Sequence, residues 1–269
     1  MLSVVLATYN EEKNIEKCLR SIKEIAGEII VVDGSSTDKT PDLAKKLGAK
    51  VIITSNKPNF HINKQMAMDE AKGELVLQLD ADEWPDDELK EFIKRTHKII
   101  MKEGYRGPLA WWLKRKNYFL GQYFQKGGQY PDPVIRLYVN GYAKLPQKDV
   151  HEQMQVKGEI GWAEGHLIHF ANPTFADYLR KFGTYTSFKA HQLEKDGIQI
   201  NPVTTLEYIG IKPLKTFLQI FIRHKGFVDG VPGFVFAVMS GLHHAVAYLQ
   251  LWELKEKKKL AKEGNYASR

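Results

Sequence analysis

Short apolar runs alternate with amphipathic stretches along the first 80 residues. Four runs are nearly continuously apolar and β-branched, which predicts buried strands: residues 2–7, 28–32, 51–54 and 75–79. The segments between them place apolar residues at helical spacing, which predicts helices over about 14–25, 39–47 and 62–71. Strands that alternate with helices in this way predict an α/β fold with a mainly parallel sheet covered by helices on both faces.

After about residue 172 this alternation gives way to long helical patterns. They cover about 174–195, 205–226 and 231–262. We therefore expect an α/β domain over residues 1–172, with parts 1–100 and 101–172, and a helical C-terminal extension over residues 173–269.

Cysteine usage and the start of the chain suggest a reducing compartment. Cys18 is the only cysteine of the 269 residues and falls on the apolar stripe of the first helix with Ile15, Leu19 and Ile22. We expect it in the core, and a single cysteine excludes an internal disulfide or a multi-thiolate metal site. The first strand begins directly after Met1, which leaves no room for a signal peptide, so we expect a cytosolic N-terminal part.

The positive charge of the chain is concentrated near its C-terminus. The formal net charge is +7, which suggests an anionic partner such as nucleic acid, a lipid surface or a phosphorylated small molecule. Residues 203–269 contain 10 Lys or Arg and 5 Asp or Glu, a net charge of +5. Most of the excess charge therefore lies in the helical extension.

Residues 230–252 contain no Asp, Glu, Lys or Arg and are long enough to span a bilayer. Pro232, Gly233 and the paired His243 and His244 make this a poor spanning segment. We expect an interfacial or dimer-forming helix whose basic end meets anionic headgroups through Lys255, Lys257, Lys258 and Lys259. The alternative is an ordinary packed helix with a solvated basic end.

Polar residues follow the predicted strands at the edge where α/β sheets bind ligands. Thr8, Tyr9 and Asn10 follow the first strand, Asp33 ends the second, and Asp80 and Asp82 follow the fourth. Asp80 and Asp82 would lie on one side of an extended segment, a spacing suited to a divalent cation. The alternative is an acidic turn that caps the helix beginning near Asp86.

Three motifs together resemble the family 2 glycosyltransferases, which have the GT-A fold. They are Ala7-Thr8-Tyr9-Asn10-Glu11-Glu12, Val32-Asp33-Gly34-Ser35-Ser36-Thr37-Asp38, and Ala71-Lys72-Gly73-Glu74 leading to Leu79-Asp80-Ala81-Asp82-Glu83. The resemblance implies a GT-A catalytic domain in which residues 1–100 bind a nucleotide-sugar and residues 101–172 form the acceptor side. It implies nucleotide-sugar contacts from Thr8, Tyr9, Asn10, Glu12, Asp33, Lys64, Asp80, Ala81 and Arg136.

Further motifs resemble the bacterial lipopolysaccharide core glucosyltransferases of that family. They are residues 127–138, Val150-His151-Glu152, His169, and Gly226-Phe227-Val228-Asp229-Gly230. This resemblance implies inverting transfer of a sugar, glucose in that group, from a UDP-sugar to a lipopolysaccharide-core or related glycolipid or oligosaccharide acceptor. It also implies a cytoplasmic, peripheral location at the inner face of the cytoplasmic membrane.

Inverting transfer requires a cation for the departing diphosphate and a base for the acceptor hydroxyl. Asp82 is the expected metal ligand with Asp80 second, and oxygen ligands with a diphosphate suit Mg²⁺ or Mn²⁺. His169 is a further candidate ligand, although it also suits a hydrogen-bonded core position. Glu152 is the expected base, with Asp132 as the alternative.

Two other function classes fit the sequence less well. A nucleotidyltransferase would require a glycine-rich loop after the first strand, which is absent. A basic membrane- or nucleic-acid-binding module without catalysis explains the charge but leaves the strand-end acids without a purpose. We therefore expect an enzyme that acts at an anionic membrane surface and does not bind nucleic acid. A homodimer is one candidate for its oligomeric state, which the sequence leaves open.

Overall fold

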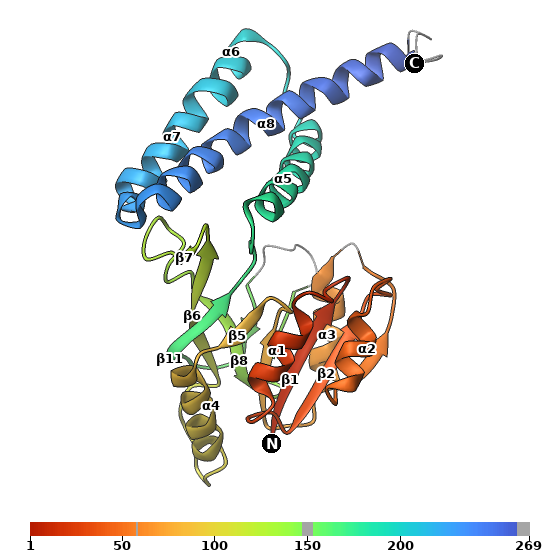
Figure 1. Ribbon diagram of the computed structural model, residues 1–269, viewed down its shortest axis with the longest axis vertical. Helices are drawn as coiled ribbons and strands as arrows, with labels where there is room; N and C mark the ends of the chain where they lie inside the picture. Colours follow the sequence, from red (N-terminus) through yellow and green to blue (C-terminus); the bar gives the residue numbers. More distant parts are fainter. Residues whose placement is uncertain (58, 147–152, 263–269) are drawn as a thin grey trace. The chain divides into compact units, whose positions relative to one another are not determined.

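The computed structural model describes residues 1–57, 59–146 and 153–262 (Figure 1). The chain forms two compact units. Unit 1 comprises Met1–Asn117 and Pro131–Ala171, and unit 2 comprises Tyr118–Tyr130 and Asn172–Arg269.

The first half of unit 1 has the predicted alternation of strands and helices (Figure 1). Its strands are β1 (Leu2–Thr8), β2 (Glu28–Asp33), β3 (Lys50–Ile53) and β4 (Leu75–Leu79). The helices between them are α1 (Ile15–Ile22), α2 (Thr40–Lys46) and α3 (Phe60–Asp69). The strands pair in parallel in the order β3-β2-β1-β4, which confirms the parallel sheet predicted for this region.

Alternation of side chains along β1 divides the core between the two faces of the sheet. Leu6 belongs to a buried cluster that also contains Cys18 of α1. Val5, one residue earlier, belongs to a second cluster that contains Ala67 of α3. The helices thus cover both faces, as predicted, and Cys18 is a buried free thiol.

The second half of the sheet is mixed. β4 pairs antiparallel with β8 (Val134–Val139), and β8 pairs antiparallel with β6 (Ala110–Phe119). Next come β11 (Ile160–His169), parallel to β6, and β5 (Glu83–Pro85), antiparallel to β11. The remaining elements are α4 (Asp87–Ile100), β7 (Gln122–Tyr123), β9 (Ala143–Lys144) and β10 (Gln155–Val156). Because β4 and β8 run in opposite directions, the end of β4 lies beside the start of β8.

Unit 2 is built from helices. They are α5 (Phe175–Lys195), α6 (Pro202–Thr205), α7 (Lys212–Leu218) and α8 (Gly230–Lys262). The predicted helix over 205–226 is interrupted by π-helical turns at Leu206–Ile211 and Gln219–Arg223, and a 3₁₀ turn follows at Gly226–Asp229. The buried carboxylate of Asp229 accepts hydrogen bonds from the backbone N–H groups of Gln125 and Lys126 at 2.7 and 3.0 Å. It therefore fixes the loop after β7 within unit 2.

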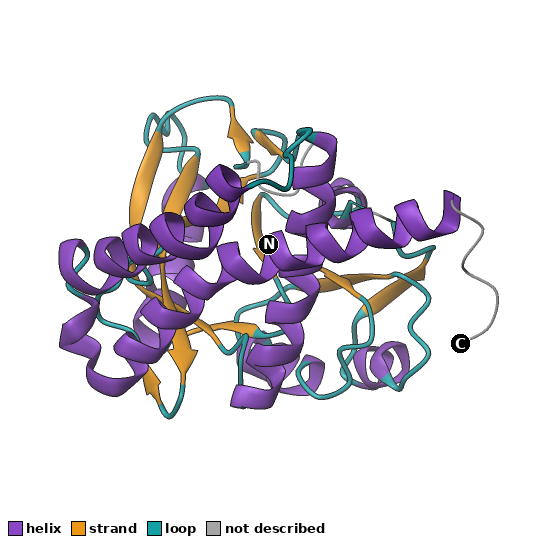
Figure 2. Cartoon of the chain, turned by 90° about the horizontal axis from the view of Figure 1, so that it is seen from above, coloured by secondary structure: helices purple, strands orange, loops and turns teal. Residues whose placement is uncertain are grey.

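Helix α8 is long and continues to the end of the described chain (Figure 2). Within the described residues, one helical stretch, Gly226–Ala261, is long and apolar enough to cross a membrane. One third of its most apolar 18-residue segment is buried inside the protein. Tyr248 of α8 stacks on Tyr208 with ring centroids 5.2 Å apart, and its hydroxyl lies 2.9 Å from Thr204 Oγ1. This part of α8 therefore packs as a core helix of unit 2.

Candidate functional site

The loops after β1 and β2 are joined by a buried carboxylate. Asp33, at the end of β2, is fully buried, and its Oδ2 accepts a hydrogen bond from Thr8 Oγ1 at 2.8 Å. The backbone N–H and the hydroxyl of Ser36 donate to the two oxygens of the same carboxylate at 2.8 and 2.7 Å. These parallel neighbours end at one edge of the sheet, so the structure brings together the predicted residues Thr8 and Asp33.

Asn10 and Glu12 strengthen this connection, and Tyr9 lies at its surface. Asn10 adopts a left-handed conformation with φ of 56°, and its side-chain oxygen accepts a hydrogen bond from the Thr37 N–H at 2.8 Å. The Glu12 carboxylate accepts one from the Lys39 N–H at 3.2 Å. The Tyr9 side chain is exposed. Asn10 and Glu12 thus shape the loops, whereas the ring of Tyr9 is accessible from solvent.

Asp80, directly after β4, lies between two buried cations. Its Oδ1 is 2.5 Å from Lys64 Nζ, and its Oδ2 is 2.7 Å from Arg136 Nη2. Arg136 also donates a hydrogen bond to Gln78. Burial alone would raise the pKa of Asp80, but Arg136 and Lys64 hold that pKa well below its usual range. Both carboxylate oxygens are therefore committed to protein cations.

Glu83 extends this ion pair into a network. Glu83 is fully buried, its Oε2 accepts the Asp80 N–H at 3.0 Å, and its Oε1 lies 3.3 Å from Arg115 Nη1. Arg136 Nη2 is 3.5 Å from the same Oε1. Arg115 in turn pairs with Asp132 Oδ2 at 2.7 Å. With Lys64 included, three cations face three carboxylates, so the network is formally neutral without Asp82.

Asp82 and His169 form a separate pair beside this network. Asp82 Oδ2 lies 3.7 Å from His169 Nε2, and the Phe170 N–H donates to the Asp82 carbonyl at 2.9 Å. His169 Nδ1 lies 2.5 Å from Asn117 Oδ1. An amide oxygen only accepts hydrogen bonds, so Nδ1 carries the hydrogen and Nε2 of the neutral ring keeps its lone pair. One carboxylate oxygen and one imidazole nitrogen are a donor set that suits a divalent cation.

The acids after β4 do not cap helix α4. That role belongs to Asp86, whose side chain accepts the Leu89 N–H at 2.9 Å. Among the described residues, Asp86, Glu88 and His166 are the group of potential metal ligands whose atoms lie within 4.8 Å of one another. Asp86 Oδ1 also accepts the His166 N–H at 3.0 Å, and its Oδ2 faces His166 Nδ1 at 3.0 Å. Asp86 therefore caps α4 and joins it to His166 of β11.

Four residues of the network were not among the predicted site residues: Gln78, Glu83, Arg115 and Asn117. The sequence contains a local signal for Arg115 and Asn117. They are two positions apart on β6, which places them on one face of the strand, and they belong to the polar run Lys114–Asn117 within an otherwise apolar segment. The strand pairing that brings this face to Asp82 is not visible in the sequence.

The structure describes one of the two predicted base candidates, Asp132. Glu152 lies outside the described residues. Asp132 has a left-handed backbone with φ of 38°, and its Oδ2 accepts hydrogen bonds from Arg115 Nε at 2.9 Å and Asn117 Nδ2 at 2.7 Å. Ala81 is buried between Asp80 and Asp82. Asn117 thus connects the Asp132 carboxylate to the His169 ring.

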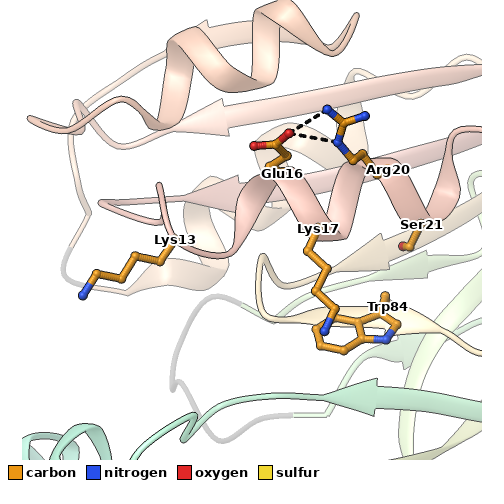
Figure 3. A pocket seen from close by; sticks show the side chains of 6 residues that line it. All are labelled: Lys13, Glu16, Lys17, Arg20, Ser21 and Trp84. Carbon is orange, nitrogen blue, oxygen red and sulfur yellow. Dashed lines mark hydrogen bonds and ion pairs between the residues drawn. The ribbon is translucent and has the colours of Figure 1, made fainter.

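An open pocket lies beside α1, with Lys13, Glu16, Lys17, Arg20, Ser21 and Trp84 around it (Figure 3). Lys17 Nζ lies 3.8 Å from the centre of the Trp84 ring, and Arg20 pairs with Glu16 at 2.7 Å. None of the predicted site residues lines this pocket. Its cations are already engaged with protein groups or exposed to solvent, so it adds no candidate catalytic group.

Comparison with known proteins agrees with this architecture. The family model "Glycosyl transferase family 2" matches residues 3–148. An uncharacterized glycosyltransferase of Rickettsia typhi is 28% identical over 268 residues, which covers 95% of this chain and 87% of the relative. The lipopolysaccharide core biosynthesis glycosyltransferase LpsC of Rhizobium meliloti is 26% identical over 253 residues, which covers 89% of this chain and 90% of LpsC.

Among solved structures, S. aureus TarS (residues 1–349) matches 99% of this chain and 93% of its own length, with 15% identity and a TM-score of 0.43. The assignment depends on the family model, which spans more than half of the chain and includes all three strand-end motifs. The mixed nine-stranded sheet flanked by helices agrees with the predicted fold. The chain belongs to glycosyl transferase family 2 and is a glycosyltransferase with the GT-A fold.

Proposed function

We propose that the protein transfers a sugar, glucose in the simplest case, from a UDP-sugar to a glycolipid or oligosaccharide of the lipopolysaccharide-core type, with inversion and with a divalent metal. The observation that carries the proposal is the placement of two groups at one edge of the sheet. These are the Thr8–Asp33 pair at the ends of β1 and β2, and the Asp82–His169 pair beyond β4.

The nucleoside is assigned to the loops after β1 and β2. The buried carboxylate of Asp33 accepts hydrogen bonds from Thr8 and Ser36, which fixes the two loops to each other. The exposed ring of Tyr9 offers a flat face on which a base can stack. Asn10 and Glu12 keep the two loops together through their backbone contacts.

The metal is assigned to Asp82 and His169. Asp80 was expected as a second ligand, but both of its oxygens are bonded to cations, so its proposed role is to anchor Lys64 and Arg136. The Asn117 amide sets the tautomer of His169, which directs Nε2 toward Asp82. An imidazole ligand favours Mn²⁺ over Mg²⁺, because Mg²⁺ selects oxygen ligands. The bound cation would neutralise charge that develops on the leaving diphosphate.

Lys64 and Arg136 supply positive charge next to the metal pair. Burial lowers the pKa of Lys64, and the neighbouring Arg136 lowers it further, whereas contact with Asp80 acts in the opposite direction. Arg136 keeps its charge because Asp80 and Glu83 outweigh the effect of burial and raise its pKa. The proposed role of these two cations, which Asp80 holds in place, is to orient the diphosphate of the sugar donor by their positive charge.

The acceptor base is proposed to be Glu152, with Asp132 as the alternative. Asp132 already shares Oδ2 with Arg115 and Asn117, which suits a positioning role near the His169 ring. The Glu152→Gln variant tests the assignment: turnover should fall by about 100-fold or more while UDP binding is retained. Wild-type turnover in Glu152→Gln would reject Glu152, and loss of turnover in Asp132→Asn instead would favour the alternative.

The acceptor class is inferred from similarity to LpsC, whose name describes lipopolysaccharide core biosynthesis. A glycolipid acceptor and the basic helical unit suggest a cytoplasmic enzyme, peripheral at the inner face of the cytoplasmic membrane. A screen of UDP-sugars by UDP release tests the proposal, with and without purified core oligosaccharide and with Mn²⁺ or EDTA. We expect acceptor-stimulated, metal-dependent release from one UDP-sugar. No release from any UDP-sugar would contradict the proposal.

A further inference from the structure

A row of large apolar side chains is exposed along the helical arm that runs from α6 through α7. Its members recur every three to five residues: Leu206, Ile211, Leu214, Leu218 and Ile222. Leu206 and Leu214 keep 64% and 59% of their surface exposed, so these side chains are outside the core. Exposed apolar side chains that recur at helical spacing are typical of a helix that binds a protein or a membrane with that side.

The opposite side of the same arm packs against α8. Tyr208 is buried on Tyr248, the Phe217 and Phe221 rings contact Phe234, and Thr216 Oγ1 lies 3.0 Å from His244 Nε2. The inward side chains are thus satisfied within unit 2. The arm therefore has apolar residues on two sides. One side packs against α8 in the core of unit 2, and the exposed row lies on the other side.

The turn that follows the arm also has exposed apolar residues, and basic residues precede them. Phe227, Val228 and Val231 are exposed, Val231 at 73% of its surface, and they follow the basic residues Arg223 and Lys225. The buried Asp229 carboxylate holds this turn through the N–H groups of Gln125 and Lys126. The apolar residues of the turn are therefore presented on a fixed backbone. Val203, just before the row, is also exposed. We call the exposed apolar residues from Val203 to Val231, in the row and in the turn, the 203–231 face.

The charge on this segment is mainly positive. Residues 203–228 contain four cations, Lys212, Lys215, Arg223 and Lys225, and one acid, Glu207. Glu207 is paired with Lys212 at 2.9 Å. Exposed apolar side chains interleaved with cations are the composition of a helix that lies in the interface of an anionic bilayer.

We propose that the 203–231 face binds the surface of a membrane that contains anionic lipids. A second copy of the chain fits less well, because two such faces would bring Lys215 and Arg223 against like charges. The acids of the segment are already engaged, since Glu207 pairs with Lys212 and the buried Asp229 accepts two backbone N–H groups. A nucleic acid would pair with the cations but would leave the apolar row in water. The proposal deepens the proposed function, since a lipid-linked acceptor would be reached at such a surface.

This assignment differs from the one expected from sequence, in which the basic end of α8 meets the headgroups. In the structure Lys258 pairs with Glu194 at 2.7 Å, Lys257 pairs with Glu253 at 2.6 Å, and Lys255 donates to the Ile198 carbonyl at 2.5 Å. Three of the four lysines expected to meet the headgroups thus make contacts within unit 2. The membrane contact is therefore placed on the arm and its turn.

Co-sedimentation of the full-length protein with lipid vesicles tests the proposal. Vesicles of phosphatidylglycerol and phosphatidylcholine are compared with vesicles of phosphatidylcholine alone. We expect wild type to bind the anionic vesicles. Leu214→Ser with Leu218→Ser should weaken the partition coefficient by about tenfold or more, because each substitution removes apolar surface from the interface. Lys215→Glu with Arg223→Glu should abolish the preference for anionic lipid.

Matched controls separate this effect from a general loss of apolar or basic surface. Leu179→Ser with Phe188→Ser removes two exposed apolar side chains of α5 in the same unit, and Lys45→Glu with Lys46→Glu removes two exposed cations of α2. Both control pairs should bind as wild type does. Unchanged circular dichroism spectra verify that every variant is folded.

Three results would overturn the proposal. They are wild type that does not sediment with anionic vesicles, test pairs that bind no worse than the control pairs, and wild type that resists carbonate extraction as a spanning protein does. A fourth result would come from sedimentation velocity without lipid. If wild type is a dimer and the variant Leu214→Ser with Leu218→Ser is a monomer, the face serves self-association instead. The vesicles contain no UDP-sugar or acceptor, so failure here is distinguishable from failure of the proposed transfer reaction.

Discussion

The two units depart from ordinary globular structure in opposite ways. In unit 1 charged side chains are buried at the edge of a sheet, and those of the network around Asp80 and Glu83 have partners of opposite sign. In unit 2 apolar side chains are exposed along a helical arm, and cations lie between them. Both arrangements cost folding free energy relative to the usual partition of residues. Buried charges of both signs suit a small charged ligand bound with a metal ion, whereas an apolar and basic face suits a lipid surface.

The largest expected effect comes from removing the carboxylate between Lys64 and Arg136. Asp80→Ala leaves both cations buried without this partner, and we expect a loss of about 3–5 kcal/mol in the free energy of unfolding. Urea unfolding followed by tryptophan fluorescence measures it, because four of the five tryptophans belong to unit 1. Asp87→Ala, at an acid whose side chain is 97% exposed, is the control. Equal stability of the two variants would show that the network is not held by Asp80.

The next effect concerns the pair beside the network. His169→Ala removes one proposed metal ligand but no member of the neutral network, so metal-dependent turnover should fall by about 100-fold. The urea midpoint should change far less than in Asp80→Ala. Comparison of turnover at rising Mn²⁺ concentration measures the effect, since a lost ligand raises the concentration required. Wild-type metal dependence in His169→Ala would remove His169 from the site.

A smaller effect is expected from Glu28, a partly buried acid of unit 1 outside the site. Burial opposes ionisation, but hydrogen bonds from the Ser3 hydroxyl and the N–H groups of Lys72 and Gly73 lower the pKa of Glu28 below 4.5. A lowered folded-state pKa contributes stability above the unfolded pKa and loses it as pH falls through the folded pKa. The melting temperatures of wild type and Glu28→Gln should therefore converge as pH falls below about 4.5. A constant difference between pH 7 and pH 3 would contradict this account.

The smallest effect on stability is expected on the 203–231 face. Leu214→Gln replaces an exposed apolar side chain, so the free energy of unfolding should change by no more than about 0.5 kcal/mol. Vesicle binding should nevertheless weaken. A loss of stability comparable to that of Asp80→Ala would mean that Leu214 packs in a core, and the contrast between the two units would fail.

The sequence predicts the first four strands and three helices well because their apolar periodicity is local. It also brings Thr8 and Asp33 together, since parallel strands end at one edge. It ranks Asp82 above Asp80 as a metal ligand, but it does not show that both oxygens of Asp80 are bonded to cations. The difference between the two acids depends on Arg136, Asn117 and His169, which reach the site through antiparallel and mixed pairings of β8, β6 and β11, and such long-range pairings have no local signature.

In the helical unit, too, the sequence predicts the elements but not the contacts between them. Periodicity predicts its helices, including α8, and charge indicates an anionic surface. Which side of each helix faces solvent depends on packing: Tyr208 and Phe217 face α8, so Leu214 and Leu218 are left outside. The intramolecular partners of the basic end of α8 were equally invisible in the sequence.

The most direct test of the central claim is calorimetry of UDP binding to wild type and Asp82→Ala, each with Mn²⁺ and with EDTA. Asp87→Ala provides the matched control. We expect wild type and the control to bind UDP in a manner that depends on Mn²⁺, and Asp82→Ala to lose that dependence while it remains folded. Equal, Mn²⁺-stimulated binding in wild type and Asp82→Ala would contradict the assignment of the metal-dependent nucleotide site to the end of β4.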